Sequence, residues 1–114
     1  MTLEARVGDV LALDRLVHEP ARLLILTVLA SAKQVEFTFL EKISGLSKGN
    51  LSSHMSKLEA AGLIEVTKRF RGKRPLTELS ISAAGRHALA EYRRRLASVV
   101  GDLPDDTAAA PKRR

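Results

Sequence analysis

The chain has 114 residues, enough for one domain with one hydrophobic core and too few for two. Its composition, 45% hydrophobic and 28% charged residues, is that of a soluble globular protein, and its net charge of +6 indicates an anionic partner. Because cysteine is absent, a disulfide framework and any zinc or iron–sulfur site built on thiolates are excluded, which fits a cytoplasmic protein.

The start of the sequence predicts two helices. Residues 7–18 carry apolar side chains at helical spacing, with Asp9 as a candidate N-cap. Pro20 suits the first position of a second helix, over residues 20–31, because the N–H that proline lacks would have no partner there. That second helix is apolar on nearly every side, so we expect it at the centre of the core.

No targeting, membrane-spanning or metal-binding segment is recognisable in the sequence. Residues 1–6 lack the charged-then-apolar run of a signal peptide. The most apolar stretch, residues 23–30, is less than half of the roughly 18 residues needed to span a bilayer. His18, His54 and His87 lie too far apart in the sequence for a metal-site motif. We therefore expect a cytoplasmic protein with no membrane contact, no metal and no cofactor.

A short strand and a third helix come next. Residues 34–37 alternate and are β-prone, which predicts one very short strand. Thr38 and Glu41 have the spacing of a capping box, with Thr38 as the N-cap. Gly45 suits the position just after a helix. We therefore expect the third helix to begin after Thr38 and to end at Gly45.

The fourth helix is predicted over about residues 48–61, between a Ser47 cap and Gly62. At about 100° per residue, its apolar side chains gather on one face and small polar ones on the other. The apolar face holds Leu51, Met55 and Leu58; the outer face holds Gly49, Asn50, Ser53, Ser56, Lys57 and Ala60. Such an outer face can enter the major groove of DNA, although an ordinary amphipathic surface helix has the same pattern.

A β-hairpin is predicted after the fourth helix. The first strand is predicted over residues 63–70, where apolar and polar residues alternate. Residues 71–74 are predicted to form a turn, in which Gly72 can adopt positive φ, and residues 75–81 to form the second strand. One face of the first strand carries Ile64, Val66 and Phe70.

A long last helix, capped by Ser82, closes the predicted domain, residues 1–103, and residues 104–114 are expected to be a disordered tail. The helix keeps an apolar seam of Leu89, Tyr92, Leu96, Val99 and Leu103. The first helix offers Val7, Val10 and Leu11. These two surfaces predict a homodimer through the first and last helices, the alternative being that the last helix folds back on its own domain.

The excess positive charge is concentrated in the hairpin. Residues 68–74 contain five basic residues and no acidic one, whereas residues 1–67 are nearly balanced. The five are Lys68, Arg69, Arg71, Lys73 and Arg74. We expect no folding role for them, so they predict contacts with DNA phosphates or the minor groove. The alternative is a solvated hairpin that aids solubility.

The order of these elements predicts a mainly α fold with a small β-hairpin wing, a winged helix-turn-helix extended by its terminal helices. Residues 46–64, together with residues 18–26, 68–77 and 79–86, resemble small prokaryotic winged-helix regulators related to the MarR and ArsR families. The resemblance implies a cytoplasmic DNA-binding dimer with the wing beside the recognition helix. It places at DNA the residues Lys48, Asn50, Ser52, Ser53, His54 and Lys57. Metal sensing of the ArsR type does not carry over, because its cysteine ligands are absent.

The predicted function is therefore that of a sequence-specific transcriptional regulator bound to double-stranded DNA, with no enzymatic activity. No paired carboxylates, phosphate-binding loop or nucleophile–base pair is recognisable. The alternative is a winged-helix module for protein or RNA interaction, since a fold alone does not determine a function. A small-molecule effector is compatible with the sequence but not identified by it.

Overall fold

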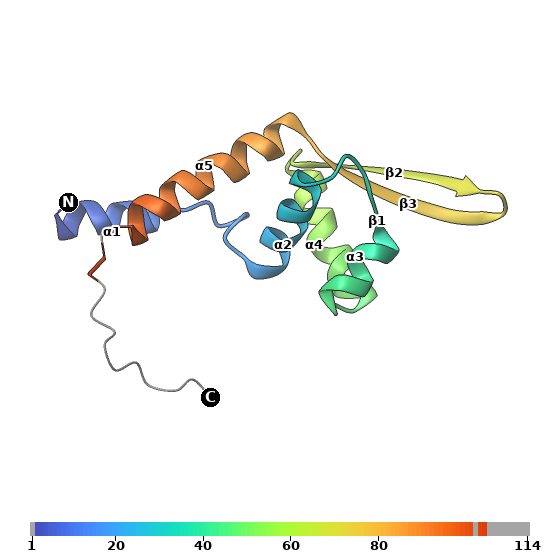
Figure 1. The fold of residues 1–114 in the computed structure, drawn as a ribbon, viewed down its shortest axis with the longest axis horizontal. Helices are drawn as coiled ribbons and strands as arrows, with labels where there is room; N and C mark the ends of the chain where they lie inside the picture. Colours follow the sequence, from blue (N-terminus) through green and yellow to red (C-terminus); the bar gives the residue numbers. More distant parts are fainter. Residues whose placement is uncertain (1, 102, 105–114) are drawn as a thin grey trace.

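The structure is a computed structural model that describes residues 2–101 and 103–104 (Figure 1). Its elements follow the predicted order and confirm the mainly α fold with a hairpin wing. They are α1 (Leu3–Leu11), α2 (Pro20–Ala30), β1 (Val35–Glu36), α3 (Phe37–Ser44), α4 (Lys48–Ala60), β2 (Ile64–Arg71), β3 (Arg74–Ile81) and α5 (Ala83–Val100). The predicted disordered tail, residue 104 excepted, lies outside the described residues.

The three strands form one antiparallel sheet in the order β1-β3-β2. β2 and β3 pair along their whole length, from Ile64 with Ile81 to Arg71 with Arg74, so Gly72 and Lys73 make the turn. Gly72 has φ of +65°, a left-handed conformation that glycine adopts without steric cost. The far half of this hairpin extends away from the helices as the wing (Figure 1).

α2 lies at the centre of the core, as its apolar sequence predicted. Ile25, Leu26 and Leu29 on α2 are fully buried. Around them pack apolar side chains from every other element except α1. The buried set includes Val17, Val35, Leu40, Leu51, Leu58, Leu63, Ile64, Leu79, Leu89 and Tyr92.

Local capping explains most of the helix boundaries. The Ser47 and Ser82 hydroxyls accept hydrogen bonds from the backbone N–H groups of Asn50 and Gly85, at 3.1 and 2.9 Å, so both predicted caps are confirmed. Pro20 is the first residue of α2, as predicted. Gly45, with φ of +70°, ends α3 in the left-handed conformation expected there.

The predicted bounds of the first helix are wrong. α1 begins after Thr2, whose hydroxyl accepts a hydrogen bond from the Ala5 N–H, and Asp9 lies inside the helix rather than at its cap. The helix ends early because the Asp14 carboxylate accepts bonds from the backbone N–H groups of Leu16 and Val17, at 2.9 and 3.4 Å. An aspartate that bonds its neighbours' backbone in this way stabilises a turn in place of a helix.

The predicted capping box at the third helix is also wrong. α3 starts at Phe37, directly after strand β1, so Thr38 is its second residue and Glu36 takes the cap position without a side-chain cap bond. The reason is tertiary: Val35 and Glu36 pair with Leu79 and Glu78 of β3, so the strand holds the backbone extended up to Glu36. The Thr38 hydroxyl instead donates to the Glu36 carboxylate at 3.4 Å.

α1 and the far half of α5 form an arm that extends from the body of the fold, on the side opposite the wing (Figure 1). The radius of gyration is 17.4 Å, against about 13 Å for a compact domain of this size. Arg6 on α1 donates to the Val99 carbonyl of α5 at 3.1 Å, which ties the two helices together. None of the α1 residues is buried.

No helix in the described part of the chain is both long enough and apolar enough to cross a bilayer.

Candidate nucleic-acid interface

The outer face of α4 is presented to solvent by the burial of its inner face. Leu51 and Leu58 are fully buried under α4 and hold the helix against the core. The opposite face, which includes Asn50, Ser53 and Lys57, is exposed. A helix held on one side by apolar contacts and free on the other has the properties that insertion into a groove requires.

A groove of about 300 Å³ runs between α4 and the base of the wing. Lys48 and Ser52 reach it from α4, and Lys68 reaches it from β2. The remaining lining residues are Phe37, Thr38, Met55, Pro75 and Thr77. The structure therefore brings together helix and wing residues that are some 16 to 20 positions apart in the sequence, and both charged residues of the lining are lysines.

The five wing cations are exposed, but strand alternation divides them between two faces of the sheet. Lys68 pairs in register with Thr77 and shares the groove side with it, whereas Arg69 and Arg71 occupy the alternate positions. On that other side, Arg69 forms an ion pair with Glu78, and Arg71 donates to Glu36 at 3.0 Å. Two of the five cations expected to contact DNA therefore form ion pairs inside the chain.

Phe70 lies on the same side of β2 as Ile64 and Val66, as the alternation predicted. Its surroundings differ from theirs, because the hairpin has extended beyond the helices at that point. Ile64 is buried, whereas Phe70 is 71% exposed.

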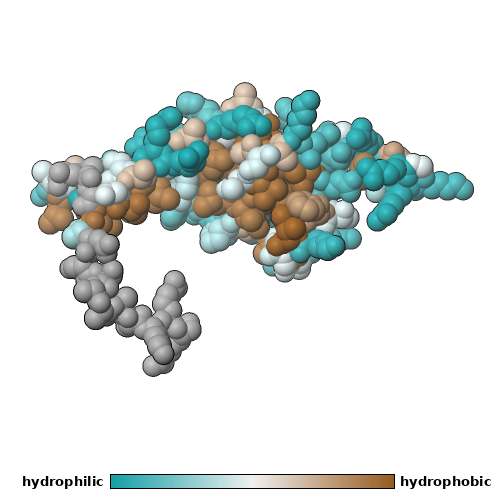
Figure 2. Space-filling model, in the orientation of Figure 1, coloured by the Kyte–Doolittle hydropathy of each residue, from teal (hydrophilic) through white to brown (hydrophobic). Residues whose placement is uncertain are grey.

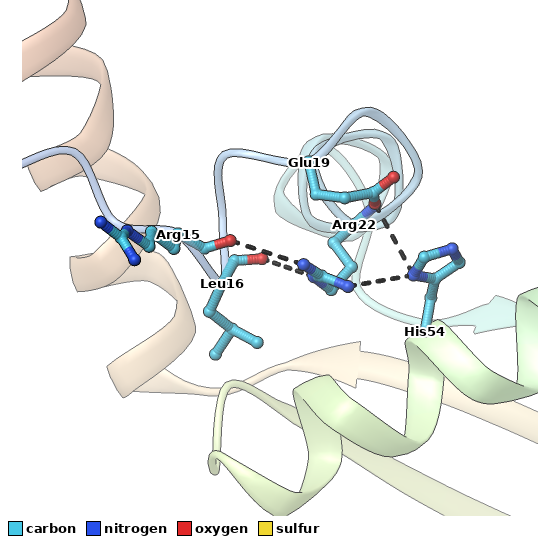
Figure 3. Close-up of polar contacts among 5 residues, drawn as sticks. All are labelled: Arg15, Leu16, Glu19, Arg22 and His54. Atoms are coloured by element: carbon cyan, nitrogen blue, oxygen red, sulfur yellow. Dashed lines mark hydrogen bonds and ion pairs between the residues drawn. The ribbon is translucent and has the colours of Figure 1, made fainter. Parts of the chain in front are cut away.

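His54 points from α4 toward the start of α2 rather than straight outward (Figure 3). Its Nδ1 lies 3.2 Å from Arg22 Nη1 and 3.6 Å from a carboxylate oxygen of Glu19. The side chain is half-buried in this position. His54 therefore connects the candidate recognition helix to α2, a role that its sequence position did not predict.

Arg22 is the centre of this contact (Figure 3). Its Nε donates to the Leu16 carbonyl at 2.6 Å and its Nη2 to the Arg15 carbonyl at 3.4 Å. Glu19 accepts a hydrogen bond from the Arg22 backbone N–H at 2.8 Å and so caps α2. One guanidinium thus joins the linker from the α1–α5 arm to the helix that presents the outer polar face.

The pKa of Glu19 lies below its ordinary value. Partial burial alone would raise it, but hydrogen bonds from the backbone N–H groups of Arg22 and Ala21 outweigh burial, with help from the His54 and Arg22 charges. A lowered pKa in the folded state means that the ionised carboxylate stabilises the fold. This stability is present above the pKa of the unfolded chain and is lost as the pH falls through the lower folded value.

We expect Glu19→Gln to lower the free energy of unfolding at pH 7 by about 0.5–1 kcal/mol, because the helix loses a charged cap at its positive end. The wild type should lose this contribution of the Glu19 carboxylate to the free energy of unfolding as the pH falls below roughly pH 5, whereas the variant has no such contribution to lose. Urea unfolding at pH 7 and pH 4 measures both values. An equal loss on acidification in the two proteins would contradict this account.

Sequence reasoning missed four residues of this region: Glu19, Arg22, Glu36 and Glu78. Glu19 and Arg22 lie in the segment that carried part of the family resemblance, so a signal was present. The sequence around Glu36 and Glu78 carried no such signal, because their arginine partners are 35 and 9 positions away. Within residues 2–101 and 103–104, no cluster of three or more His, Asp or Glu side chains could hold a metal ion.

Comparison with known proteins identifies relatives over most of the chain. Residues 21–100 match the family described as winged helix DNA-binding domain. An uncharacterized protein of Methanocaldococcus jannaschii is 32% identical over 78 residues, which cover 68% of this chain and 85% of that protein. The transcriptional regulator homologue protein from Pyrococcus horikoshii OT3 is 27% identical, with a TM-score of 0.77 over 87% of this chain and 99% of that one. NadR, solved in complex with 4-hydroxyphenylacetate, shares the fold at 19% identity, with a TM-score of 0.61 over 84% of this chain and 70% of its own.

Proposed function

The chain belongs to the family of winged helix DNA-binding domains, and on that premise we propose that it is a cytoplasmic transcriptional regulator that reads a specific double-stranded DNA sequence as a homodimer. One observation carries the proposal. Lys48 and Ser52, which lie beside the outer polar face of α4, border the same groove as Lys68 at the base of the wing. A duplex can meet both surfaces at once.

In this arrangement α4 enters the major groove. Asn50, Ser53 and Lys57 face outward from it and can donate to base edges or phosphates. Lys48 and Ser52 lie closer to the wing and are suited to the DNA backbone. His54 is held by Arg22, so it reaches at most the backbone at the flank of the helix.

The wing follows the DNA backbone or enters the adjacent minor groove. Lys73 and Arg74 stand at its turn, where they are exposed. Arginine and lysine side chains neutralise phosphates and release counterions, which adds affinity that depends strongly on salt but not on sequence.

The arm supports the homodimer. α1 leaves Leu3, Val7, Val10 and Leu11 exposed, and Leu3 is 77% exposed. Leu89, Tyr92 and Val99 of the predicted seam are buried within the same chain and Leu96 is half-buried, so only Leu103 of the seam remains exposed, together with Val100 on α5. Hydrophobic surface gathers along one side of the arm, whereas the wing is hydrophilic (Figure 2). A contiguous apolar strip of this kind is typical of a subunit interface.

Selection of bound duplexes from a random pool tests the function and the dimer together. We expect an inverted repeat whose half-sites are centred about one helical turn, roughly 10 base pairs, apart. Asn50→Ala should relax the base preference at one position of each half-site and leave the repeat spacing unchanged. A single unpaired site would contradict the dimer. Equal binding of duplex, single-stranded DNA and RNA of one length would instead favour the interaction-module alternative.

A further inference from the structure

The base of the wing holds two carboxylates next to each other on the sheet face opposite the groove. Glu36 of β1 and Glu78 of β3 are partners in register. Like charges directly opposite each other in a sheet repel. Each is compensated by an arginine of β2, Glu78 by Arg69 and Glu36 by Arg71. Two of the five wing cations therefore have their charges matched inside the chain.

The Arg69–Glu78 pair is the stronger restraint. Glu78 is only 8% exposed, and within the described residues its Oε1 has no polar partner other than Arg69. If Arg69 turned away to a phosphate, a buried carboxylate would be left without compensation, which is costly. The Arg71–Glu36 pair is more open, since 70% of the Arg71 side chain is exposed, so its restraint is weaker.

We propose that Glu78 and, to a lesser degree, Glu36 determine specificity by holding Arg69 and Arg71 away from DNA, which limits affinity for unrelated sequences. This inference rests on the proposed DNA binding. It revises the sequence-based expectation for the wing: Lys68, Lys73 and Arg74 contact phosphates, and Arg69 and Arg71 position the strand that carries them. A wing with fewer free cations leaves a larger share of the binding energy to base contacts by α4.

Fluorescence anisotropy with a labelled random-sequence duplex, measured across a salt series, tests the proposal. Each phosphate contact contributes about 0.9 to the slope of log affinity against log salt. Glu78→Gln should release Arg69, tighten binding about three- to tenfold at 0.1 M salt and steepen the slope by about one. Glu36→Gln should do the same to a smaller extent. Arg69→Gln should leave the slope unchanged.

Lys73→Gln is the matched control, since it removes one wing charge that has no carboxylate partner among the described residues, and it should flatten the slope by about one. The double variant Arg69→Gln with Glu78→Gln should return to the wild-type slope. Arg69→Gln should also lower the melting temperature, whereas Lys73→Gln should not, because only the former leaves Glu78 unpaired.

The outcomes separate this inference from the function on which it rests. If Arg69→Gln flattens the slope as much as Lys73→Gln, or if Glu78→Gln and Glu36→Gln leave the affinity unchanged, the restraint is refuted while DNA binding stands. If the wild type itself ignores duplex DNA at low salt, both are refuted. Should Glu78→Gln unfold, the Arg71→Gln and Glu36→Gln variants of the more exposed pair decide the same question.

Discussion

Replacing both Lys73 and Arg74 by alanine is expected to weaken binding to every duplex by about ten- to a hundredfold near 0.1 M salt. The salt slope should become less steep by one to two units, because two phosphate contacts and their released counterions are lost. Both residues are exposed at the wing turn, so the fold should be unaffected. Anisotropy titrations over a salt series, with circular dichroism to verify folding, measure the effect.

Asn50→Ala is the control that separates the two kinds of contact. Asn50 lies on the outer face of α4, and its loss should affect the preferred sequence far more than unrelated ones. If the wing variant and the Asn50 variant lost affinity equally on all sequences, the division between phosphate contacts by the wing and base contacts by α4 would be wrong.

The second large effect concerns stability. Gly85→Ala is expected to lower the free energy of unfolding by about 3 kcal/mol, which corresponds to a fall in melting temperature of more than about 10 °C. A Cβ atom at Gly85 would lie 2.0 Å from the Leu63 carbonyl oxygen and 2.7 Å from Ile81 Cγ1. The first clash is with backbone, so the first turn of α5 would have to move away from the start of β2.

This close approach also connects the start of α5 to the turn that follows α4. The Ser82 N–H donates to the Leu63 carbonyl at 3.0 Å, and the Ser82 hydroxyl donates to the Gly62 carbonyl at 2.6 Å. Gly49→Ala is the matched control, because nothing lies within 4 Å of a Cβ there and its φ is not positive. It should stabilise the helix slightly, by about 0.5–1 kcal/mol. If Gly85→Ala melted at the same temperature as the wild type, the backbone at Gly85 would not lie as close to the Leu63 carbonyl as the structure places it.

The fold was predictable from the sequence because its main signals are local. Ser47, Ser82 and Pro20 act within three residues of their own positions, and Gly45 and Gly72 act through their own backbone angles. The hydrophobic periods of the segments then assign helix or strand without knowledge of the partner. The same signals were enough for the family resemblance, which the match over residues 21–100 confirms.

Apart from the first helix, which the local turn at Asp14 ends early, the errors arose where a distant partner overrode a local pattern. Thr38 has the spacing of a capping residue, but the pairing of Glu36 with Glu78 moves the start of α3 ahead of it. The apolar seam of α5 looked free along its length, yet Leu89 and Tyr92 pack into the core of the same chain. The Glu36–Glu78 pairing joins residues 42 positions apart, and Tyr92 contacts His18 across 74 positions.

The sequence alone therefore determined which segments are helices and strands, where most of them end, and that positive charge gathers on one hairpin. Only the tertiary structure decided which of those charges are free, because an ion pair depends on distance in space: Arg69 and Arg71 meet carboxylates that β-pairing brings to them. It also decided why Gly85 has no side chain and why His54 turns toward Arg22. Such contacts form between elements, and a linear pattern carries no information about the distance between them.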